Sequence, residues 1–284
     1  MKTIYHFSGA GNDFVVIDGR EGDVSAYREV PRIEALCKQY KTDGLMILGM
    51  PDQVGHDDGS TGSATFMADR DRPSVDFTME FYNPDGSGGM MCGNGGRCIV
   101  AFADYLGIKP ASGGVFLFMA PDGLHTGEIL ERPADDLWTV RIKMIDVQGI
   151  TPMLGGYFLN TGTRHFVKFV DDVEQVDVAA EGKALRWNEA FAPIGTNVNF
   201  VQVAPDGLHV RTFEKGVEGE TLACGTGLTA CALVAHHAGV PTATPGAYRL
   251  RARQDWLSVN FTPGADEKFT DVYLTGPARL VEIH

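Results

Sequence analysis

Two stretches of the sequence share one layout and decide the fold. The first is Cys92-Gly93-Asn94-Gly95-Gly96-Arg97-Cys98-Ile99-Val100-Ala101-Phe102-Ala103-Asp104-Tyr105-Leu106-Gly107. The second is Cys224-Gly225-Thr226-Gly227-Leu228-Thr229-Ala230-Cys231-Ala232-Leu233-Val234-Ala235-His236-His237-Ala238-Gly239. In each, a cysteine and a glycine turn precede a segment that is apolar on nearly every side, which is typical of a buried helix. Each segment ends at a glycine suited to a left-handed C-cap, 15 residues after the cysteine. The equal lengths indicate an internal duplication.

Most of the remaining chain is predicted to be β-strand. Alternating apolar residues occur in five runs, namely 75–81, 137–144, 196–203, 208–213 and 256–261. The 35 glycines suit tight turns between strands. Residues 31–40 are predicted to form an amphipathic helix that buries Ile33, Leu36 and Cys37. We therefore expect an α+β fold of two pseudo-symmetric domains, each a curved, mostly antiparallel sheet around a central apolar helix, with the active site in the cleft between them.

The polar stretch 131–136 suggests where one half ends. We expect an N-terminal half of residues 1–135 plus 273–284, which carries Cys92, and a C-terminal half of residues 136–272, which carries Cys224. The polar stretch 50–73 lacks periodicity and is expected to be a mobile loop.

The composition excludes several classes of function. The 24 Lys and Arg against 37 Asp and Glu give a formal charge of −13, which is unsuited to binding duplex nucleic acid. The sequence has no apolar leader and no run near the roughly 20 apolar residues of a membrane span. We expect a cytoplasmic protein without a membrane partner. The five cysteines are an odd number, so a disulfide framework is not expected.

The two leading cysteines point to acid/base chemistry. A helix N-terminus offers free N–H groups and a partial positive charge, which bind a carboxylate and stabilise a thiolate. Two thiols that face one carbon can remove a proton from one face and deliver a proton to the other. The outcome is inversion of a stereocentre. No lysine motif identifies a pyridoxal phosphate site, and no cofactor is expected.

Other roles for the cysteines fit less well. Cys37, Cys98 and Cys231 are expected to be core thiols. The spacings Cys-x5-Cys and Cys-x6-Cys fall outside the usual zinc pattern, so no metal is expected. The glycine turns lack a Walker lysine and a dinucleotide fingerprint. A thiol redox module with a Cys92–Cys224 disulfide and a non-catalytic ligand-binding protein stay as alternatives.

Four motifs resemble those of diaminopimelate epimerases. They are Phe7-Ser8-Gly9-Ala10-Gly11-Asn12-Asp13-Phe14, Tyr82-Asn83-Pro84-Asp85-Gly86-Ser87, Met91 to Cys98 and Glu220 to Gly227. The resemblance covers nearly the whole chain apart from residues 50–73. It implies a cofactor-independent enzyme that interconverts LL- and meso-2,6-diaminopimelate in lysine and peptidoglycan precursor synthesis, usually as a homodimer.

The resemblance also implies roles for individual residues. Cys92 and Cys224 are the acid/base pair, and His165 and Glu214 assist the thiols or orient the substrate. The substrate-binding positions implied are Asn12, Asn83, Gly93, Asn94, Thr163, Asn197, Glu214, Lys215, Gly225 and Thr226. His236 and His237 have no counterpart and are expected to be structural, in the last turn of a helix.

Three departures from the family pattern concern the substrate pocket. Lys215 replaces the usual arginine, which keeps the charge but loses the bidentate fork. Thr163-Arg164-His165 replaces Asn-Pro-His or Ser-Pro-His, so that Arg164 either takes over the altered contact or points to solvent. The loop 40–44 departs from the usual glycine-rich sequence. Racemisation of another amino acid, such as histidine, is therefore the alternative activity.

Overall fold

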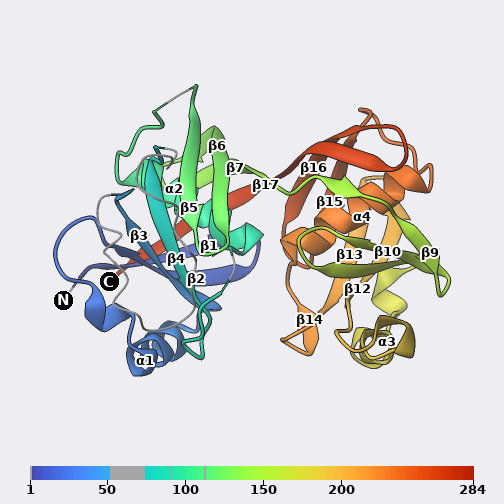
Figure 1. The fold of residues 1–284 in the computed structure, drawn as a ribbon, viewed down its shortest axis with the longest axis horizontal. Coiled ribbons are helices and arrows are strands. Elements are labelled where there is room, and N and C mark those ends of the chain that lie inside the picture. Colours follow the sequence, from blue (N-terminus) through green and yellow to red (C-terminus); the bar gives the residue numbers. More distant parts are fainter. Residues whose placement is uncertain (1, 52–73, 90, 112) are drawn as a thin grey trace. The chain divides into compact units, whose positions relative to one another are not determined.

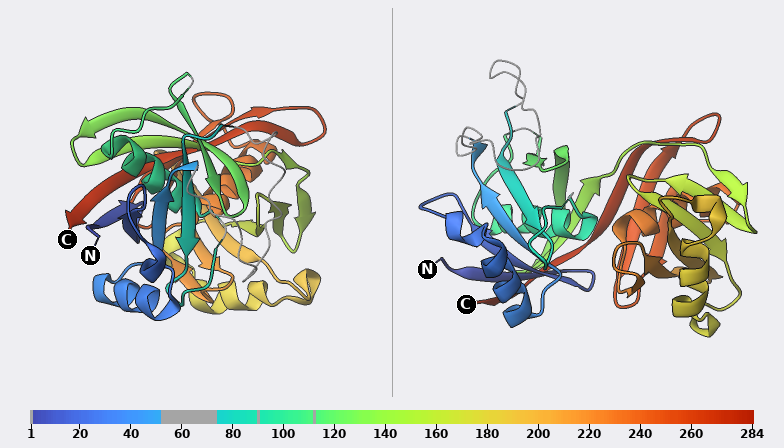
Figure 2. Two further views of the ribbon diagram at one scale, coloured as in Figure 1. Left: turned by 60° about the vertical axis from the view of Figure 1, so that its left-hand side comes forward. Right: turned by 60° about the horizontal axis from the view of Figure 1, so that its bottom comes forward.

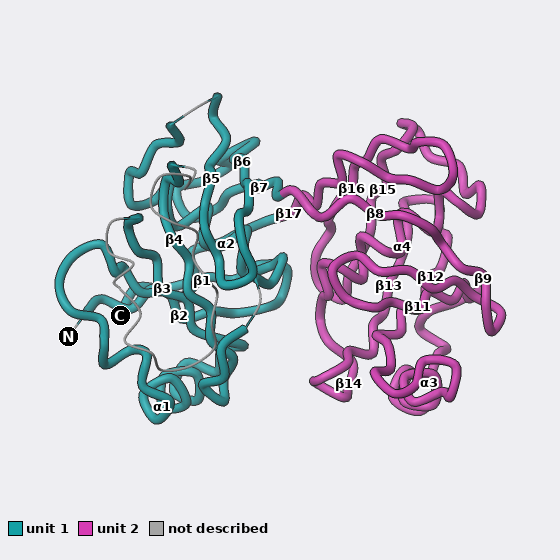
Figure 3. The backbone as a smooth tube through the Cα atoms, viewed as in Figure 1, with its two compact units in different colours: residues 1–142, 277–284 teal, residues 143–276 magenta. Residues whose placement is uncertain are grey.

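The computed structural model describes residues 2–51, 74–89, 91–111 and 113–284. The chain forms two compact units, which Figure 3 draws in different colours. Unit 1 comprises residues 1–142 and 277–284, and unit 2 comprises residues 143–276. The predicted boundary at residues 135 and 136 lies in a β-hairpin of unit 1. From residue 52 onward, the predicted loop 50–73 lies outside the described residues.

The sheet of unit 1 is a closed circuit of strands (Figure 1). Its strands are β1 (Ile4–Gly9), β2 (Asn12–Asp18), β3 (Gly44–Gly49), β4 (Phe77–Tyr82), β5 (Val115–Ala120), β6 (Gly123–Ala134), β7 (Leu137–Lys143) and the end of β17 (Lys268–Ile283). Consecutive strands from β1 to β7 pair with one another, and β17 pairs with both β7 and β1. The β2–β3 and β4–β5 pairs are parallel, and the other consecutive pairs are antiparallel. Closure of the circuit removes exposed sheet edges.

Helix α2 (Gly93–Tyr105) lies inside this circuit, and this position accounts for its apolar sequence. All residues from 93 to 103 are buried, so an apolar side chain is favourable on every side of the helix. The helix ends at Gly107, whose φ of +78° confirms the predicted left-handed cap. A second helix, α1 (Val30–Tyr40), buries only one side, through Ile33, Leu36 and Cys37, as predicted.

Unit 2 repeats this construction. Its strands are β8 (Val147–Gln148), β9 (Thr151–Met153), β10 (Gly156–Asn160), β11 (Arg164–Phe169), β12 (Asn197–Ala204), β13 (Gly207–Glu214), β14 (Gly219–Thr221), β15 (Ala247–Arg251), β16 (Trp256–Pro263) and the start of β17. Its helices are α3 (Val178–Arg186) and the buried α4 (Gly225–His237). Single-turn 3-10 helices are η1 (Ser25–Tyr27) in unit 1 and η3 (Val173–Gln175) and η4 (Glu189–Phe191) in unit 2.

The order of strand pairing is the same in the two units. From β1 to β7, the successive pairs are antiparallel, parallel, antiparallel, parallel, antiparallel and antiparallel. The pairs from β10 through β11, β12, β13, β15 and β16 to β17 follow the same series. Helices α1 and α3 span the first parallel connection, and α2 and α4 span the second. The shared topology confirms the predicted α+β fold built from a duplicated unit.

Further details of unit 2 agree with the sequence pattern. Gly239 ends α4 with a φ of +73°, the counterpart of Gly107. The alternating runs 196–203, 208–213 and 256–261 coincide with β12, β13 and β16. Figure 2 shows both chain termini at one edge of unit 1, where Ile4 and His284 exchange two backbone hydrogen bonds. No helix in the described ranges is long and apolar enough to span a membrane.

Candidate active site

Cys92 stands at the N-terminal start of α2. It is the N-cap residue, has extended backbone angles and is half-buried, and its carbonyl accepts the N–H of Gly96 at 2.7 Å. The N–H groups of Gly93 and Asn94 belong to the first turn, which has no earlier carbonyl within the helix to accept them. This end of α2 therefore suits a carboxylate and a thiolate.

A polar network holds Asn94 behind Cys92. Arg97 is fully buried, and its Nη2 donates to Asn94 Oδ1 at 2.8 Å while its Nε donates to the Pro277 carbonyl at 3.3 Å. Asn94 Nδ2 donates in turn to Asn12 Oδ1. Asn12 Nδ2 donates to Asp43 Oδ2 at 3.2 Å. Two of the predicted substrate-binding asparagines thus contact each other, and the altered loop 40–44 supplies the carboxylate that orients Asn12.

Asn83 lies just after β4 and is oriented by its own turn. Its Nδ2 donates to Ser87 Oγ at 3.0 Å, and its backbone N–H donates to the Ser87 carbonyl at 2.9 Å. These contacts tie the side chain to the turn 83–87. Unit 1 therefore places Cys92, Gly93, Asn94 and Asn12 together, with Asn83 on a separate turn.

Cys224 occupies the same position at the start of α4. It is the N-cap residue and is 8% exposed, and its Sγ lies 3.5 Å from Thr226 Oγ1. A Cβ at Gly227 would lie 3.3 Å from Cys224 Sγ and 2.5 Å from Asn199 Oδ1. Glycine at this position lets the thiol and the Asn199 amide approach the first turn of the helix closely.

His165 contacts the Cys224 site through Thr226. Its Nε2 lies 2.9 Å from Thr226 Oγ1, and its Nδ1 lies 3.1 Å from Asn199 Nδ2. The imidazole is fully buried, and this burial lowers its pKa to about 3. A histidine with this pKa is neutral near pH 7. His165 thus reaches the Cys224 thiol indirectly, through the Thr226 hydroxyl.

Asn197 contacts two further positions of the predicted site in unit 2, Thr163 and Lys215, and the backbone of Arg164. Its Nδ2 donates to the Arg164 carbonyl at 2.9 Å and approaches Thr163 Oγ1 at 3.4 Å, while its Oδ1 accepts the Lys215 N–H at 2.8 Å. Asn197 is only 3% exposed. The Asn197 amide therefore holds the backbone at Arg164, next to Thr163, and at Lys215.

Glu214 and Arg164 have separate partners. Glu214 Oε2 accepts the Thr221 hydroxyl at 3.0 Å, which places the carboxylate beside the strand that leads to Cys224. Arg164 Nη1 donates to the Phe191 carbonyl at 3.3 Å, and its guanidinium lies over the Phe158 ring at 5.2 Å. The carbonyl and the ring hold the partly buried Arg164 side chain within unit 2, and a contact of its guanidinium with substrate stays a prediction.

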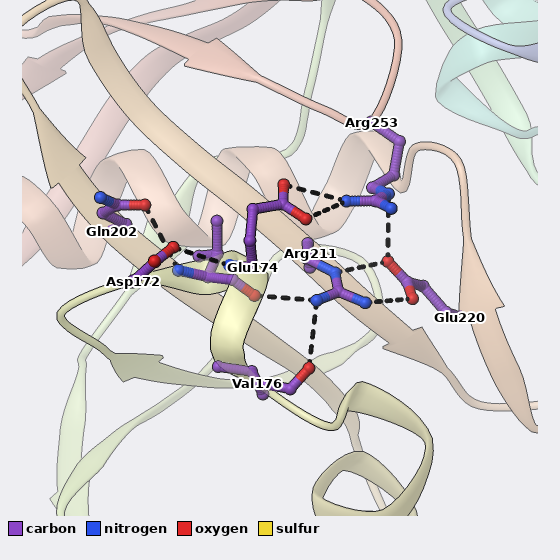
Figure 4. Close-up of polar contacts among 8 residues, drawn as sticks. Asp172, Glu174, Val176, Gln202, Arg211, Glu220 and Arg253 are labelled. Carbon is purple, nitrogen blue, oxygen red and sulfur yellow. Dashed lines mark hydrogen bonds and ion pairs between the residues drawn. The ribbon is translucent and has the colours of Figure 1, made fainter.

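The segment that carries Cys224 is anchored by the ionic cluster in Figure 4. Arg211 on β13 makes a bidentate pair with Glu220 on β14, with N–O distances of 2.8 and 2.7 Å. Arg253 bridges from Glu220, at 3.4 Å, to Glu174, at 2.9 Å. The Arg253 N–H also donates to the Leu222 carbonyl at 3.1 Å. Strand β14 and the residues just before Cys224 are thus tied to the body of unit 2.

The remaining thiols lie in the cores, as predicted. Cys37, Cys98 and Cys231 are 3%, 0% and 0% exposed. Burial raises the pKa of each of these thiols, so they stay protonated near neutral pH. Among the described residues, no group of three or more His, Cys, Asp or Glu side chains is arranged to hold a metal ion.

Three residues of these sites were not identified from the sequence. Arg97 orients Asn94, Asn199 contacts His165, and Thr212 donates to Asn199 Oδ1 at 2.9 Å. Asn199 and Thr212 are buried polar residues within strands that otherwise bury apolar side chains. Such an interruption of an apolar run is the signal that could have identified them.

Comparison with solved structures defines the class of fold. A phenazine biosynthesis protein of the PhzF family from Bacillus anthracis superposes with a TM-score of 0.71 at 10% identity, covering 100% of this chain and 98% of that chain. A probable proline racemase from Agrobacterium radiobacter gives a TM-score of 0.62 at 13% identity, covering 100% and 92%. At these identities the likeness concerns the fold alone.

Sequence comparison identifies the family. The family profile for diaminopimelate epimerase matches residues 157–281. A diaminopimelate epimerase from Chlorobaculum tepidum is 36% identical, with 96% of this chain and 97% of the relative covered. A diaminopimelate epimerase from Aquifex aeolicus is 37% identical, with 96% and 93% covered. The chain belongs to the diaminopimelate epimerase family.

Proposed function

We propose that this protein is a cofactor-independent isomerase that converts LL-2,6-diaminopimelate to the meso isomer, with Cys92 and Cys224 as its acid/base groups. The observation that carries the proposal is the repeated placement of a cysteine as N-cap of a buried helix, once in each unit. Family membership supports diaminopimelate as the substrate over another amino acid, such as histidine.

The proposed reaction needs both thiols to reach one carbon. The thiolate of one cysteine takes the α-proton as the C–H bond breaks, and the thiol of the other delivers its proton to the opposite face. The negative charge that develops spreads into the α-carboxylate. Backbone N–H groups at the helix starts, from Gly93 and Asn94 in unit 1 and Gly225 and Thr226 in unit 2, are proposed to stabilise that charge. After one turnover the two cysteines have exchanged protonation states.

Further aspects of the proposal concern the rest of the pocket and the setting. Asn12, Asn83 and Asn197 are proposed to bind substrate, Glu214 and His165 to assist the thiols or orient the substrate, and Thr163 and Lys215 to line the distal end. We also propose a cytoplasmic homodimer that acts in lysine and peptidoglycan precursor synthesis. The formal charge of −13 supports a small-molecule substrate over nucleic acid.

The first test is proton NMR of the reduced protein in D2O with LL-diaminopimelate. The expected result is loss of the α-proton signal together with appearance of the meso isomer. Folded protein with free thiols that leaves the α-proton in place would refute the proposed substrate, and exchange on histidine instead would establish the alternative racemase.

Cys92→Ala and Cys224→Ala test the two-base assignment. Each variant is expected to lose epimerisation by at least about 10²- to 10⁴-fold, the usual contribution of a positioned acid or base. Cys37→Ala, which removes a thiol on the buried side of α1 that is only 3% exposed, is the matched control and retains turnover. Substantial epimerisation by either Ala variant at Cys92 or Cys224 would contradict the mechanism.

Lys215→Arg tests recognition of the distal carboxylate. A guanidinium binds a carboxylate through two parallel hydrogen bonds, whereas an ammonium is a point charge. We expect the KM for diaminopimelate to fall by about fivefold with kcat little changed, since the contact is remote from the reacting carbon. An unchanged or higher KM would count against this role of position 215.

A further inference from the structure

We propose that Asn199 is a positioning residue for Cys224, acting through His165 to make the Thr226 hydroxyl a hydrogen-bond donor to Cys224 Sγ. The inference rests on the proposed function, because it assigns the support of one of the two acid/base thiols. It follows from a chain of hydrogen bonds that leaves only one arrangement of protons.

The orientation of the Asn199 side-chain amide is set by two neighbours. Its Oδ1 accepts the Thr212 hydroxyl at 2.9 Å, and its Nδ2 donates to the Phe166 carbonyl at 3.0 Å. A carbonyl oxygen only accepts, so the atom that faces it must be the NH2 group. Asn199 is fully buried and Thr212 is 3% exposed, so water does not compete for these bonds.

The amide in turn selects the tautomer of His165. The second proton of Asn199 Nδ2 points to His165 Nδ1 at 3.1 Å, so Nδ1 must be the acceptor. The neutral imidazole then carries its proton on Nε2. A doubly protonated ring would set an N–H against the Asn199 N–H, which agrees with the lowering of the His165 pKa by burial.

The tautomer leaves the Thr226 proton for the thiol. His165 Nε2 donates to Thr226 Oγ1 at 2.9 Å, so this oxygen acts as an acceptor toward the ring. Its own proton is directed to the other close neighbour, Cys224 Sγ, at 3.5 Å. A hydrogen bond donated to a thiolate is charge-assisted and favours the deprotonated form. Cys224 is thereby prepared to act as the base.

Most of the other titratable groups on the elements around α4 are engaged elsewhere. Strands β12 and β16 carry no titratable side chain. On β11, Arg164 bonds to a carbonyl and Lys168 pairs with Glu181 at 3.4 Å. On β13, Arg211 pairs with Glu220, and Glu214 accepts the Thr221 hydroxyl. His209, also on β13, pairs with Asp206 at 2.8 Å.

On the remaining elements, Tyr157 of β10 packs edge-on against His237, and Arg249 of β15 lies over the Trp256 ring. Tyr248 of β15 donates to the Val240 carbonyl at 2.7 Å. Within α4 itself, Cys231 is fully buried and protonated. His165 is therefore the titratable group whose tautomer sets the orientation of the Thr226 hydroxyl.

Unit 1 has no hydroxyl at the matching position. The residue two places after Cys92 is Asn94, whose side chain bonds to Arg97 and Asn12. The proposed device is thus specific to Cys224, and Cys92 serves as an internal reference in any measurement on the same sample.

The test is the rate of iodoacetamide alkylation at Cys224 and Cys92 across pH, resolved by peptide mass spectrometry on the whole reduced chain without substrate. Four proteins are compared: the natural chain, Thr226→Val, Thr226→Ser and Asn199→Asp. The carboxylate that Asn199→Asp introduces would accept a hydrogen bond from His165 Nδ1–H, which favours the neutral tautomer with its proton on Nδ1. His165 Nε2 would then become an acceptor and draw the Thr226 proton away from sulfur.

At pH 7 we expect Cys224 alkylation to slow by about tenfold in Thr226→Val and in Asn199→Asp, the effect of a thiol pKa about one unit higher. Thr226→Ser keeps the hydroxyl and should stay within about threefold of the natural chain. Cys92 should react equally in all four proteins. Cys224 rates that are unchanged in Thr226→Val or in folded Asn199→Asp, or rates that fall alike for both cysteines, would overturn the proposal.

Folding is monitored in the same digest, because Cys98 and Cys231 are 0% exposed and react only when the cores open. If Asn199→Asp exposes Cys231, the comparison of Thr226→Val with Thr226→Ser decides whether the Thr226 hydroxyl speeds the alkylation of Cys224. Alkylation needs no turnover, so a natural chain that fails to epimerise diaminopimelate refutes the proposed function while this comparison still tests the positioning role.

Discussion

His165 shows how one buried side chain combines a positioning role with a cost in stability. It is fully buried, and burial lowers its pKa to about 3 from the ordinary 6.5. A neutral ring can keep one nitrogen as acceptor and the other as donor, whereas a cation cannot. The site therefore uses this histidine as an oriented dipole near neutral pH.

The lowered pKa predicts how stability depends on pH. Between the folded and unfolded pKa values, the unfolded chain binds a proton that the folded chain does not, so stability rises with pH through this window. The contribution of the neutral His165 to stability is fully present above the pKa of histidine in the unfolded chain, and it is lost as the pH falls toward 3. This one group should cost about 2 kcal/mol on going from pH 7 to pH 5.

The measurement is urea denaturation of the natural chain and of His165→Gln at both pH values. The variant lacks the titrating ring, so its loss of stability on acidification should be smaller by about that amount. Parallel pH dependence in the two proteins would show that the His165 pKa does not differ between the folded and unfolded states.

At the scale of elements, α2 depends on a close approach to β1. A Cβ at Gly9 would lie 2.9 Å from both the Asn94 carbonyl oxygen and Cys98 Sγ. The backbone angle of Gly9 is not in the left-handed region, so space alone requires glycine there. This contact seats the first turn of the helix, where Cys92 stands.

Gly9→Ala should destabilise the protein by about 1–3 kcal/mol, the usual cost of overpacking a core. It should also raise the KM, because the N–H groups of the first turn move. Gly88→Ala is the matched control, since a Cβ there meets no atom within 4 Å. Thermal unfolding compares the two variants, and equal melting temperatures would contradict the steric argument.

The ionic cluster of Figure 4 makes a second prediction for the elements. Arg211 and Glu220 are 12% and 26% exposed and form a bidentate pair that Arg253 extends. Arg211 also keeps the pKa of Glu220 below its usual range. Glu220→Gln should lower the free energy of unfolding by about 1–2 kcal/mol, more than an isolated surface pair contributes.

Glu181→Gln in the same unit is the matched control. Lys168 and Glu181 are 36% and 46% exposed and lie 3.4 Å apart. Loss of this exposed ion pair should change the free energy of unfolding by no more than about 0.5 kcal/mol. Urea midpoints give both values. Similar values for the two variants would show that the cluster adds nothing beyond ordinary surface pairs.

At the scale of the whole molecule, strand β17 belongs to both units. Its last residues pair with β1, and the Pro277 carbonyl accepts a hydrogen bond from the buried Arg97. The sheet of unit 1 is therefore completed by the C-terminal end of the chain.

Removal of residues 277–284 should open unit 1 and leave the core of unit 2 closed. Cys37 and Cys98 report on unit 1, and Cys231 reports on unit 2. We expect the first two thiols to become reactive toward Ellman's reagent in the shortened chain while Cys231 stays protected. Protection of all three would show that unit 1 stays closed without residues 277–284, and exposure of all three would show that the core of unit 2 also needs them; either result would contradict the prediction.

Local patterns in the sequence were sufficient for the elements. The apolar run after Cys92 and the one after Cys224 predicted two buried helices, and the left-handed φ values of Gly107 and Gly239 confirm their ends. The burial of Cys98 and Cys231 was also predictable, because a helix apolar on every side leaves no exposed face. The residue motifs further pointed to the family that the comparisons establish.

The contacts that support the thiols could be determined only by the tertiary structure. His165 meets Thr226 across 61 positions of sequence, and Asn94 meets Asn12 across 82. Such pairs depend on which strands lie beside the helix starts, and no local periodicity records this. The sequence by itself thus determined the helices, their caps and the two leading cysteines, whereas the tertiary structure decided which buried polar groups orient Thr226 and Asn94.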